Sequence, residues 1–236
     1  MCQDCGCGDP QLVPVDVHEK ILAGNDRTAA HNREHFRARG VLVINLMGSP
    51  GSGKTAVLEA TAALAGDRLR LGAISGDLAT DNDAARLRAA GIPSVAITTG
   101  SACHLDAELV HHALHDFEWR DLDLLCIENV GNLVCPAVYD LGQAANVVAL
   151  SVTEGEDKPL KYPVMFKTAD LVLLTKTDLL PYVPVRMDAI HEALAHVMPV
   201  PRLLPVSART GEGMDRWLTW LEQHLLQRGV GEHVHV

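Results

Sequence analysis

The stretch VLVINLMGSPGSGKT, residues 41–55, decides the fold of this 236-residue chain. Its first part, VLVINLM, is almost entirely apolar, which is typical of a strand buried on both faces of a parallel sheet. Its second part, GSPGSGKT, fits the pattern G-x-x-x-x-G-K-S/T, and the helix-like run TAVLEATAALAG follows at 55–66. A strand, a glycine-rich loop and a helix in this order predict a phosphate-binding loop.

Short apolar runs recur along the rest of the chain and alternate with helix-like segments. The runs lie at 69–75, 93–99, 122–129, 146–152, 171–176 and 202–208. This alternation predicts an α/β fold in which a mostly parallel sheet of about seven strands has helices on both faces. We place this P-loop NTPase domain at 40–228, after a flexible tail (1–14) and a helical extension (15–39) interrupted near Gly24 and Asn25. A frayed tail is expected at 229–236.

The glycine-rich loop supplies the groups that bind a nucleotide. Its glycines let backbone N–H groups face the phosphates, and the N-terminus of the following helix adds positive potential. Lys54 is expected to neutralise the β- and γ-phosphates, and the Thr55 hydroxyl to bind Mg²⁺. The predicted nucleotide-binding residues are Gly48, Ser49, Pro50, Gly51, Ser52, Gly53, Lys54, Thr55 and Ala56.

TKTD, residues 175–178, ends a later strand and is similar to the N-K-x-D motif that binds guanine in GTPases. Asp178 would accept hydrogen bonds from guanine N1–H and the exocyclic amine, which adenine does not offer in that arrangement. The alkyl chain of Lys176 would cover the base, and Thr175 stands where the motif has asparagine. After the last strand comes SAR, which is similar to the S-A-K loop that contacts guanine through its backbone: Ser207, Ala208 and Arg209. Together the two motifs predict GTP rather than ATP.

Acidic residues follow two of the predicted strands. In GDLATDND, residues 76–83, we expect Asp77 to contact Mg²⁺, with Asp83 as an alternative and Asp81 as a helix cap. Glu128 ends the run at 122–129, where a Walker-B acid would hold Mg²⁺ through water or orient the attacking water. Lys54, Asp77 and Glu128 are therefore the predicted catalytic residues. No glutamine or arginine is in an obvious position to orient water, so slow hydrolysis is expected.

Cysteine occurs in two further places after predicted strands. Cys103 and His104 follow the third run, and Cys135 follows the fourth. Loops that follow parallel strands meet at one edge of the sheet, so these side chains can meet beside the predicted acids. Two thiolates and an imidazole suit Zn²⁺ or Ni²⁺, although two inert cysteines and a surface histidine fit the sequence equally well. Cys126, within an apolar strand, is expected to be a buried thiol.

Three more cysteines stand in the first residues of the chain, MCQDCGCG: Cys2, Cys5 and Cys7. A Cys5–Cys7 disulfide would close a small strained ring, whereas three close thiolates can hold one metal ion. His31 and His35 have helical spacing and could also share a metal, but a solvated helix face is the expectation there.

The net charge of −10, without a basic block, disfavours nucleic acid and anionic membranes as partners. No run is long enough for a membrane span, and the start of the chain does not have the pattern of a secretory signal. We therefore expect a cytoplasmic protein whose clustered cysteines serve metal chemistry rather than disulfides.

Several motifs together resemble those of HypB, a family of GTPases that assist nickel delivery to nickel–iron hydrogenase. They cover essentially the whole chain: C-x-x-C-G-C in the tail, GSPGSGKT, GDLAT (76–80), TTGSACHLDA (98–107), ENVGNLVCPA (128–137), DKPLKYP (157–163) and the TKTD–SAR pair. The resemblance implies a SIMIBI-type fold, the class of signal-recognition and MinD proteins, and a homodimer that forms when GTP is bound. It also implies partners, namely HypA-type maturation proteins and a hydrogenase large subunit.

The resemblance assigns metals and one further lysine. It implies a nickel site at Cys2, Cys5 and Cys7, and a weaker nickel or zinc site at the dimer interface formed by Cys103, His104 and Cys135. Lys161 would reach the nucleotide of the other subunit. The chain departs from the family at Thr175 and Arg209, and it lacks the long histidine-rich stretch of some members.

Two other functions remain open from the residues. One is a nickel- or zinc-buffering protein in which the nucleotide only stabilises the fold. The other is a urease-type nickel accessory GTPase, which is disfavoured because such proteins carry Cys-Pro-His, whereas Ala137 follows Cys135 and Pro136 here.

Overall fold

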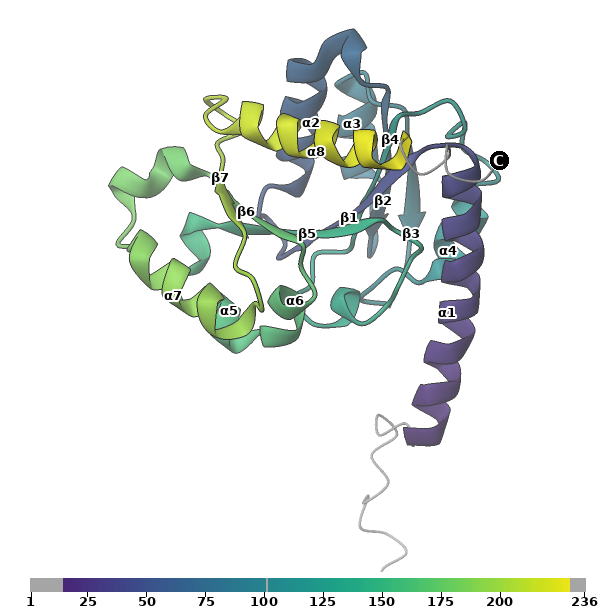
Figure 1. Cartoon of the computed structure of the whole chain (residues 1–236), viewed down its shortest axis with the longest axis horizontal. Coiled ribbons are helices and arrows are strands. Elements are labelled where there is room, and N and C mark those ends of the chain that lie inside the picture. Colours follow the sequence, from purple (N-terminus) through teal and green to yellow (C-terminus); the bar gives the residue numbers. More distant parts are fainter. Residues whose placement is uncertain (1–14, 101, 230–236) are drawn as a thin grey trace, which may run out of the picture.

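Seven strands pair side by side in the computed structural model, which describes residues 15–100 and 102–229 (Figure 1). Their order across the sheet is β3-β2-β4-β1-β5-β6-β7, and every pair is parallel. The strands are β1 (Leu42–Gly48), β2 (Leu71–Asp77), β3 (Ser94–Thr98), β4 (Leu124–Glu128), β5 (Ala145–Ser151), β6 (Leu171–Thr175) and β7 (Leu203–Pro205). The predicted parallel α/β sheet is therefore confirmed.

Helices connect the strands and precede the first of them. They are α1 (Val15–Ala38), α2 (Lys54–Ala65), α3 (Asn82–Ala89), α4 (Ala107–Ala113), α5 (Lys158–Lys161), α6 (Pro163–Lys167), α7 (Met187–Val197) and α8 (Met214–Gly229). Short 3₁₀ segments lie at Gly66–Arg68, Cys135–Ala137, Val152–Glu154 and Thr177–Tyr182. Within the described ranges, no helix combines the length and apolarity that crossing a membrane demands.

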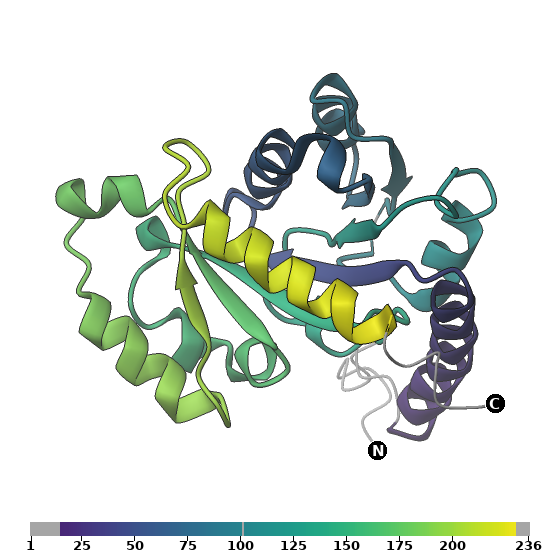
Figure 2. The ribbon, with the colours of Figure 1, turned by 45° about the horizontal axis from the view of Figure 1, so that its top comes forward.

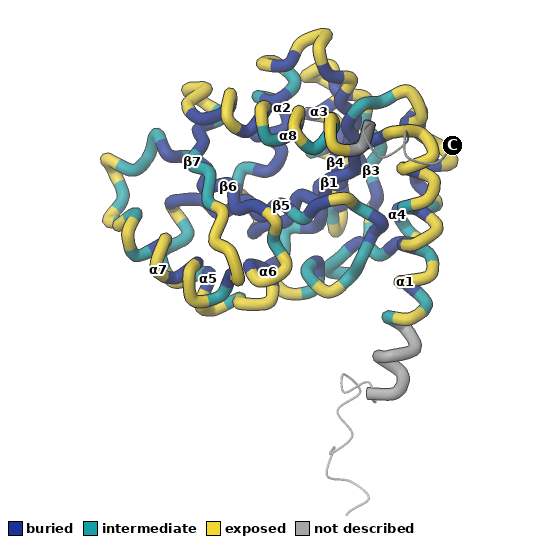
Figure 3. The backbone as a smooth tube through the Cα atoms, in the orientation of Figure 1, coloured by how far each residue is buried: buried dark blue, intermediate teal, exposed yellow. Residues whose placement is uncertain are grey.

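The helices cover both faces of the sheet (Figure 2). Because neighbouring residues of a strand point to opposite faces, Ile44 packs in the layer that contains α2 and α8, and Val43 in the layer that contains α1 and α4. A third cluster packs α6 and α7 under β5 and β6. The five inner strands are almost entirely buried, the edge strands β3 and β7 are partly buried, and the outer faces of the helices are exposed (Figure 3). Burial on both faces explains why the inner strands are continuously apolar.

The expected interruption of the first helix near Gly24 and Asn25 is wrong, because α1 runs without a break from Val15 to Ala38. The buried side chain of Asn25 donates to the carbonyl of Asp140 at 2.9 Å and accepts from the N–H of Ala107 at 2.9 Å. These tertiary hydrogen bonds offset the weak local preference of Gly-Asn for helix. The helix is therefore an integral part of the packed structure, fixed against α4.

The carboxyl ends of the strands meet along one edge of the sheet. Gly48 ends β1, Asp77 ends β2, Glu128 ends β4 and Thr175 ends β6. In open parallel sheets, ligands bind outside this edge. The fold thus gathers most of the chemically important residues of the sequence in one region.

Candidate functional site

The loop between β1 and α2 has a backbone that depends on glycine. Gly48 has φ of 149°, and a Cβ at this residue would lie 2.4 Å from the carbonyl oxygen of Ala149. Gly53 has φ of 97° and forms the N-cap of α2, so that the helix begins at Lys54. Residues with side chains rarely adopt such angles. The glycines therefore allow the loop to turn tightly and to point the first turn of α2 into the site.

Lys54, the first residue of α2, is buried, and its side chain turns back onto this loop. Its Nζ donates to the carbonyl oxygens of Ser49, at 3.1 Å, and Gly48, at 3.4 Å. Burial lowers the pKa of Lys54, although Glu128 and Asp83 act in the opposite direction. A desolvated ammonium with only carbonyl partners gains strongly from a phosphate, which brings a full negative charge.

The Thr55 hydroxyl lies between two carboxylates. Its Oγ1 is 2.8 Å from Glu128 Oε1 and 3.1 Å from Asp83 Oδ1. Burial raises the pKa of Glu128 to about 7, and its Oε2 is buried without a hydrogen-bond partner. Oxygens of three residues lie at this spacing, and the second oxygen of Glu128 has no partner, so the group fits a divalent cation such as Mg²⁺.

Asp77 lies in the same pocket but makes different contacts. Its carboxylate accepts from the N–H of Leu78 and the hydroxyl of Thr80, both at 2.5 Å, and it does not contact Thr55. Asp77, Asp83, Glu128 and the phosphate loop line a pocket of about 470 Å³. Asp81 stands at the N-cap position of α3 without a side-chain capping bond and forms an ion pair with Arg88 at 3.6 Å. In this state Asp83 is therefore closer to the Thr55 oxygen than the expected Asp77.

The TKTD and SAR segments form a second, smaller pocket of about 250 Å³ next to the phosphate loop. Asp178 accepts a hydrogen bond from the Ser207 hydroxyl at 2.7 Å, which fixes its carboxylate. Lys176 has φ of 59° and its Nζ donates to the carbonyl of Gly51 at 2.6 Å. Ala208 and Arg209 also line this pocket. An acceptor carboxylate in a largely apolar slot is what a guanine base requires.

Thr175, the departure from the guanine motif, has a role that the sequence did not indicate. Its hydroxyl donates to the carbonyl of Ser52 at 2.5 Å. The side chain at this motif position therefore connects the base pocket with the phosphate loop. The threonine hydroxyl makes this hydrogen bond to Ser52 from a side chain that is shorter than the asparagine of the usual motif.

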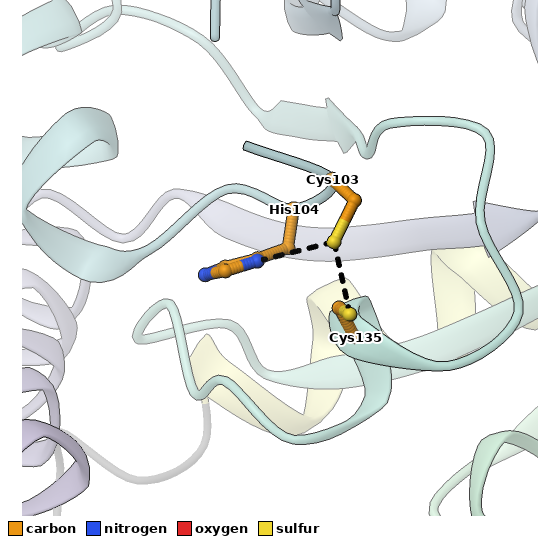
Figure 4. Close-up of side chains that lie close together, drawn as sticks. All are labelled: Cys103, His104 and Cys135. Carbon is orange, nitrogen blue, oxygen red and sulfur yellow. Dashed lines mark hydrogen bonds between the residues drawn. The ribbon is translucent and has the colours of Figure 1, made fainter. Parts of the chain in front are cut away.

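Cys103 and His104, which follow β3, come together with Cys135, which follows β4 (Figure 4). The two sulfurs are 3.0 Å apart, His104 Nδ1 is 3.9 Å from Cys103 Sγ, and the three ligating atoms all lie within 4.8 Å of one another. Cys135 follows β4 at the start of the Cys135–Ala137 turn, whereas Cys103 and His104 precede α4. Two sulfurs and one imidazole nitrogen at this spacing can hold one soft or borderline metal ion.

The surroundings act on the two kinds of ligand in opposite directions, because they favour the protonated thiol of Cys135 and the neutral imidazole of His104. The hydrogen bond to Cys103 raises the pKa of Cys135 to about 11, so the apo site keeps a proton that a metal ion would displace. Burial lowers the pKa of His104, which keeps its imidazole neutral and able to bind a metal. His104 also stacks on Tyr139, with ring centroids 3.9 Å apart, and this contact fixes the orientation of its ring.

The segment from Glu128 to Cys135 packs directly on the phosphate loop. Gly48 and Asn132 form an isolated β-bridge, and Gly131 lies so close to Pro50 that an added Cβ would be 2.9 Å from its ring and its nitrogen. The Asn132 amide in turn donates to the carbonyl of Cys103 at 3.3 Å. Sequence reasoning did not identify Asn132, because a β-bridge between two loops leaves no periodic pattern. We call residues 128–135 the connecting segment.

The remaining predicted site residues lie elsewhere. Lys161, on α5, is exposed and forms an ion pair with Asp157 at 2.5 Å. Cys126 is buried in β4, and burial raises the pKa of its thiol. The proposed metal ligands Cys2, Cys5 and Cys7 lie outside the described residues.

Known proteins are similar to this chain in sequence and in structure. The family model of the CobW/HypB/UreG nucleotide-binding domain matches residues 42–203. The hydrogenase maturation factor HypB of Azotobacter chroococcum mcd 1 is 54% identical over 216 residues, which are 92% of this chain and 70% of that protein.

Two solved structures are also similar over most of their length. HypB from Archaeoglobus fulgidus is 40% identical with a TM-score of 0.80, and the match covers 86% of this chain and 100% of that one. HypB from Helicobacter pylori, solved in complex with nickel, is 38% identical with a TM-score of 0.83, and the match covers 90% and 99% of the two chains.

Proposed function

Because the chain belongs to the HypB family of hydrogenase maturation factors, we propose that it is a nickel-binding GTPase that delivers nickel during nickel–iron hydrogenase maturation. GTP is the substrate and Mg²⁺ its cofactor, and Ni²⁺ is the cargo, with Zn²⁺ as a competitor at the sulfur sites. A GTP-dependent homodimer, a HypA-type protein and a hydrogenase large subunit are the proposed partners, and the cytoplasm is the proposed location.

Hydrolysis begins with the triphosphate on the loop of residues 48–55. The loop N–H groups and Lys54 hold the β- and γ-phosphates and stabilise the charge that develops on them. A water molecule attacks the γ-phosphorus, the bond to the β–γ bridging oxygen breaks, and GDP and inorganic phosphate result. Thr55, together with Asp83 or Asp77 and Glu128, would hold Mg²⁺ directly or through water, and the ion would supply further positive charge at these phosphates.

The base is recognised separately from the phosphates. Asp178 accepts from guanine, with its carboxylate oriented by the Ser207 hydroxyl at 2.7 Å. The Lys176 side chain, now on the Gly51 carbonyl at 2.6 Å, lies next to the base pocket. Arg209 replaces the lysine of the S-A-K loop, and its contribution to binding is through the backbone.

Nickel binds at Cys103, His104 and Cys135 and, in the first residues, at Cys2, Cys5 and Cys7. When GTP binds, the loop from Asp77 to Asp83 rearranges around the γ-phosphate and two subunits associate through this edge. Lys161 then contacts the nucleotide of the other subunit. Hydrolysis reverses these changes, loosens the metal ligands and releases nickel to the next protein.

One observation carries this proposal: the connecting segment joins the acid of the nucleotide site to a ligand of the metal site. Glu128 contacts Thr55 at one end, Asn132 pairs with Gly48 in the middle, and Cys135 contacts Cys103 at the other end. A change in the phosphate loop therefore moves the metal ligands, and metal binding in turn affects the loop.

The test is the effect of Ni²⁺ on GTP hydrolysis by the full-length chain. Phosphate release is measured with and without Ni²⁺ for the wild type, for Cys103→Ala/Cys135→Ala, and for Cys126→Ala as the matched cysteine control. The proposal expects the ratio of the two rates to differ from one in the wild type and in the control, and to become one in the double variant. An unchanged ratio in the double variant would refute the coupling, and phosphate release that persists in Lys54→Ala would refute the assigned hydrolytic site.

A further inference from the structure

Histidines from α1 and α4 lie close together on the surface, apart from the site formed by Cys103, His104 and Cys135. His31 and His35 lie on α1, and His111 and His112 in the last turn of α4, with His115 just after it. The ring centroids of His31 and His35 are 4.3 Å apart, His111 is 5.3 Å from His31 and 6.3 Å from His35, and His115 is 5.0 Å from His111. The sequence shows only the pair on α1, because His111 is brought to it by tertiary packing.

The two histidines of α1 have a spacing that fits one metal ion. His31 Nε2 and His35 Nε2 are 2.9 Å apart and share a hydrogen bond, whose proton a bound ion would replace. Two imidazole nitrogens bound to an ion at about 2.05 Å lie about 2.9 Å apart when the angle at the metal is near 90°, and about 3.3 Å apart when it is tetrahedral. A right angle is the geometry of square-planar or octahedral ions such as Ni²⁺ and Cu²⁺.

The tautomer of His111 follows from its contact with Asn32. The amide nitrogen of buried Asn32 donates to the carbonyls of Ala107, at 2.9 Å, and Leu141, at 3.4 Å, so its Oδ1 must face His111 Nδ1, which is 3.0 Å away. An amide oxygen only accepts, so His111 Nδ1 carries the proton and Nε2 keeps its lone pair. A hydrogen bond from the second ring nitrogen to a fixed acceptor is the usual support of a metal-binding histidine.

The cluster is also held on a rigid base. Asn25 and Asn32 each bond α1 to the first residue of α4, Ala107, and Arg33 forms a two-pronged ion pair with Asp140 at 2.6 and 2.7 Å. Figure 1 shows α1 and α4 lying together at one end of the sheet. Burial and the neighbouring histidines lower the pKa of His111, which favours the neutral ring. The ring nitrogens of His31, His35 and His111 do not all lie within 4.8 Å of one another, so the His111 ring must move toward the pair on α1 when an ion binds, while the two helices stay packed.

We propose that His31, His35 and His111 form an additional site for a divalent transition-metal ion of the Ni²⁺ type, with His115 as the nearest further ligand. This site is separate from Cys103, His104 and Cys135 and uses nitrogen ligands alone. Imidazole nitrogen is a borderline donor, so the site accepts Ni²⁺ or Cu²⁺ and does not retain Mg²⁺, which prefers oxygen.

The experiment isolates this site in the full-length chain by replacing the sulfur ligands. In a background with Cys2, Cys5, Cys7, Cys103 and Cys135 changed to serine, Ni²⁺ binding is measured by calorimetry. His31→Gln/His35→Gln and His111→Gln are compared with His196→Gln, an exposed histidine of α7. The background and the His196→Gln control should bind one Ni²⁺, and the cluster variants should bind it about tenfold or more weakly.

A second measurement distinguishes lost ligands from lost structure. His31 and His35 are exposed, so the double variant should keep the far-ultraviolet dichroism and the unfolding temperature of its background. Cu²⁺ bound to the background should show nitrogen hyperfine coupling by electron paramagnetic resonance, and this signal should be lost in the double variant. The proposed site would be refuted if the background bound no Ni²⁺, or if the Ni²⁺ affinity of the double variant were within twofold of that of the background. Neither result would bear on the proposed GTPase activity.

Discussion

Gly131→Ala tests the contact between the connecting segment and the phosphate loop most directly. Gly131 does not have a positive φ, so alanine meets no backbone strain there, and the three atoms nearest to the added Cβ all belong to Pro50. The added Cβ would lie 2.9 Å from the nitrogen and Cγ of Pro50 and 3.0 Å from its Cα. Two of these atoms belong to the backbone, so a side-chain rotation cannot relieve the overlap.

The size of the effect follows from these distances. Carbon atoms in favourable contact are about 3.5 Å apart or more, so the loop and the connecting segment must separate by about 0.6 Å. Overpacking of this kind lowers the free energy of unfolding by about 1–3 kcal/mol. Because a misplacement of about 1 Å in a catalytic site can reduce the rate about a hundredfold, we expect kcat/KM for GTP to fall about tenfold, or about 1.4 kcal/mol of transition-state stabilisation.

The assay is phosphate release at GTP concentrations well below KM, with chemical denaturation on the same samples. Gly24→Ala in α1 is the matched control, since its Cβ would meet only the end of the Arg27 side chain, at 4.0 Å. That control should keep its hydrolysis rate and gain about 0.5–1 kcal/mol in stability, because alanine is the better helix former. If Gly131→Ala hydrolyses GTP within twofold of the wild type, the contact does not position the loop and the reasoning is refuted.

Three further predictions concern single side chains. Burial raises the pKa of Glu128 from 4.5 to about 7, so the nucleotide-free protein loses stability as the pH rises through this interval. Glu128→Gln should therefore have a free energy of unfolding on the order of 1–3 kcal/mol higher than the wild type at pH 8, and show no such gain at pH 4.5. Equal unfolding temperatures of the two proteins at pH 8 would contradict the effect of burial on Glu128. Trp217→Phe should lower the free energy of unfolding by about 1–2 kcal/mol in denaturant titrations, because Trp217 Nε1 donates a hydrogen bond to buried Thr61 Oγ1 at 2.9 Å. A loss below about 0.5 kcal/mol would show that this hydrogen bond does not contribute to stability. Asp178→Asn should weaken GDP binding by about 1.5–3 kcal/mol in calorimetry and improve binding of xanthosine diphosphate, whose C2 carbonyl accepts from the new amide. Equal GDP affinity in this variant would mean that the base lies elsewhere.

The phosphate loop and the sheet could be predicted because their signals are local. A loop with this glycine spacing after an apolar strand rarely folds into anything other than a phosphate-binding loop. Strands that are apolar along their whole length must be covered by helices on both faces of the sheet. The meeting of Cys103 and Cys135 follows from the same topology, because loops after parallel strands share one edge. For these residues, the order of strands and loops along the chain is enough to predict which side chains lie close together.

Other features depend on contacts between distant segments and left no pattern in the sequence. The helix through Gly24 and Asn25 is stabilised by Asn25 bonding to Asp140 and Ala107, which lie far along the chain. The approach of Asp83 to Thr55 depends on how α3 packs, whereas the local sequence favours Asp77. The contact of His111 with Asn32 likewise exists only once α4 lies against α1.

The bridge between Gly48 and Asn132 bears on how such a protein could be redesigned. An engineer who lengthens or shortens the chain between Glu128 and Cys135 to suit a larger or smaller ion would also displace the Glu128 carboxylate from Thr55. Base preference is easier to alter, because Asp178 and Ser207 stand at the opposite side of β1, on loops after β6 and β7. The fit of the metal ion and the position of Glu128 must therefore be optimised together. Asp178, in contrast, can be replaced without changing the length of that segment, provided that the contacts of Thr175 and Lys176 with the phosphate loop are kept.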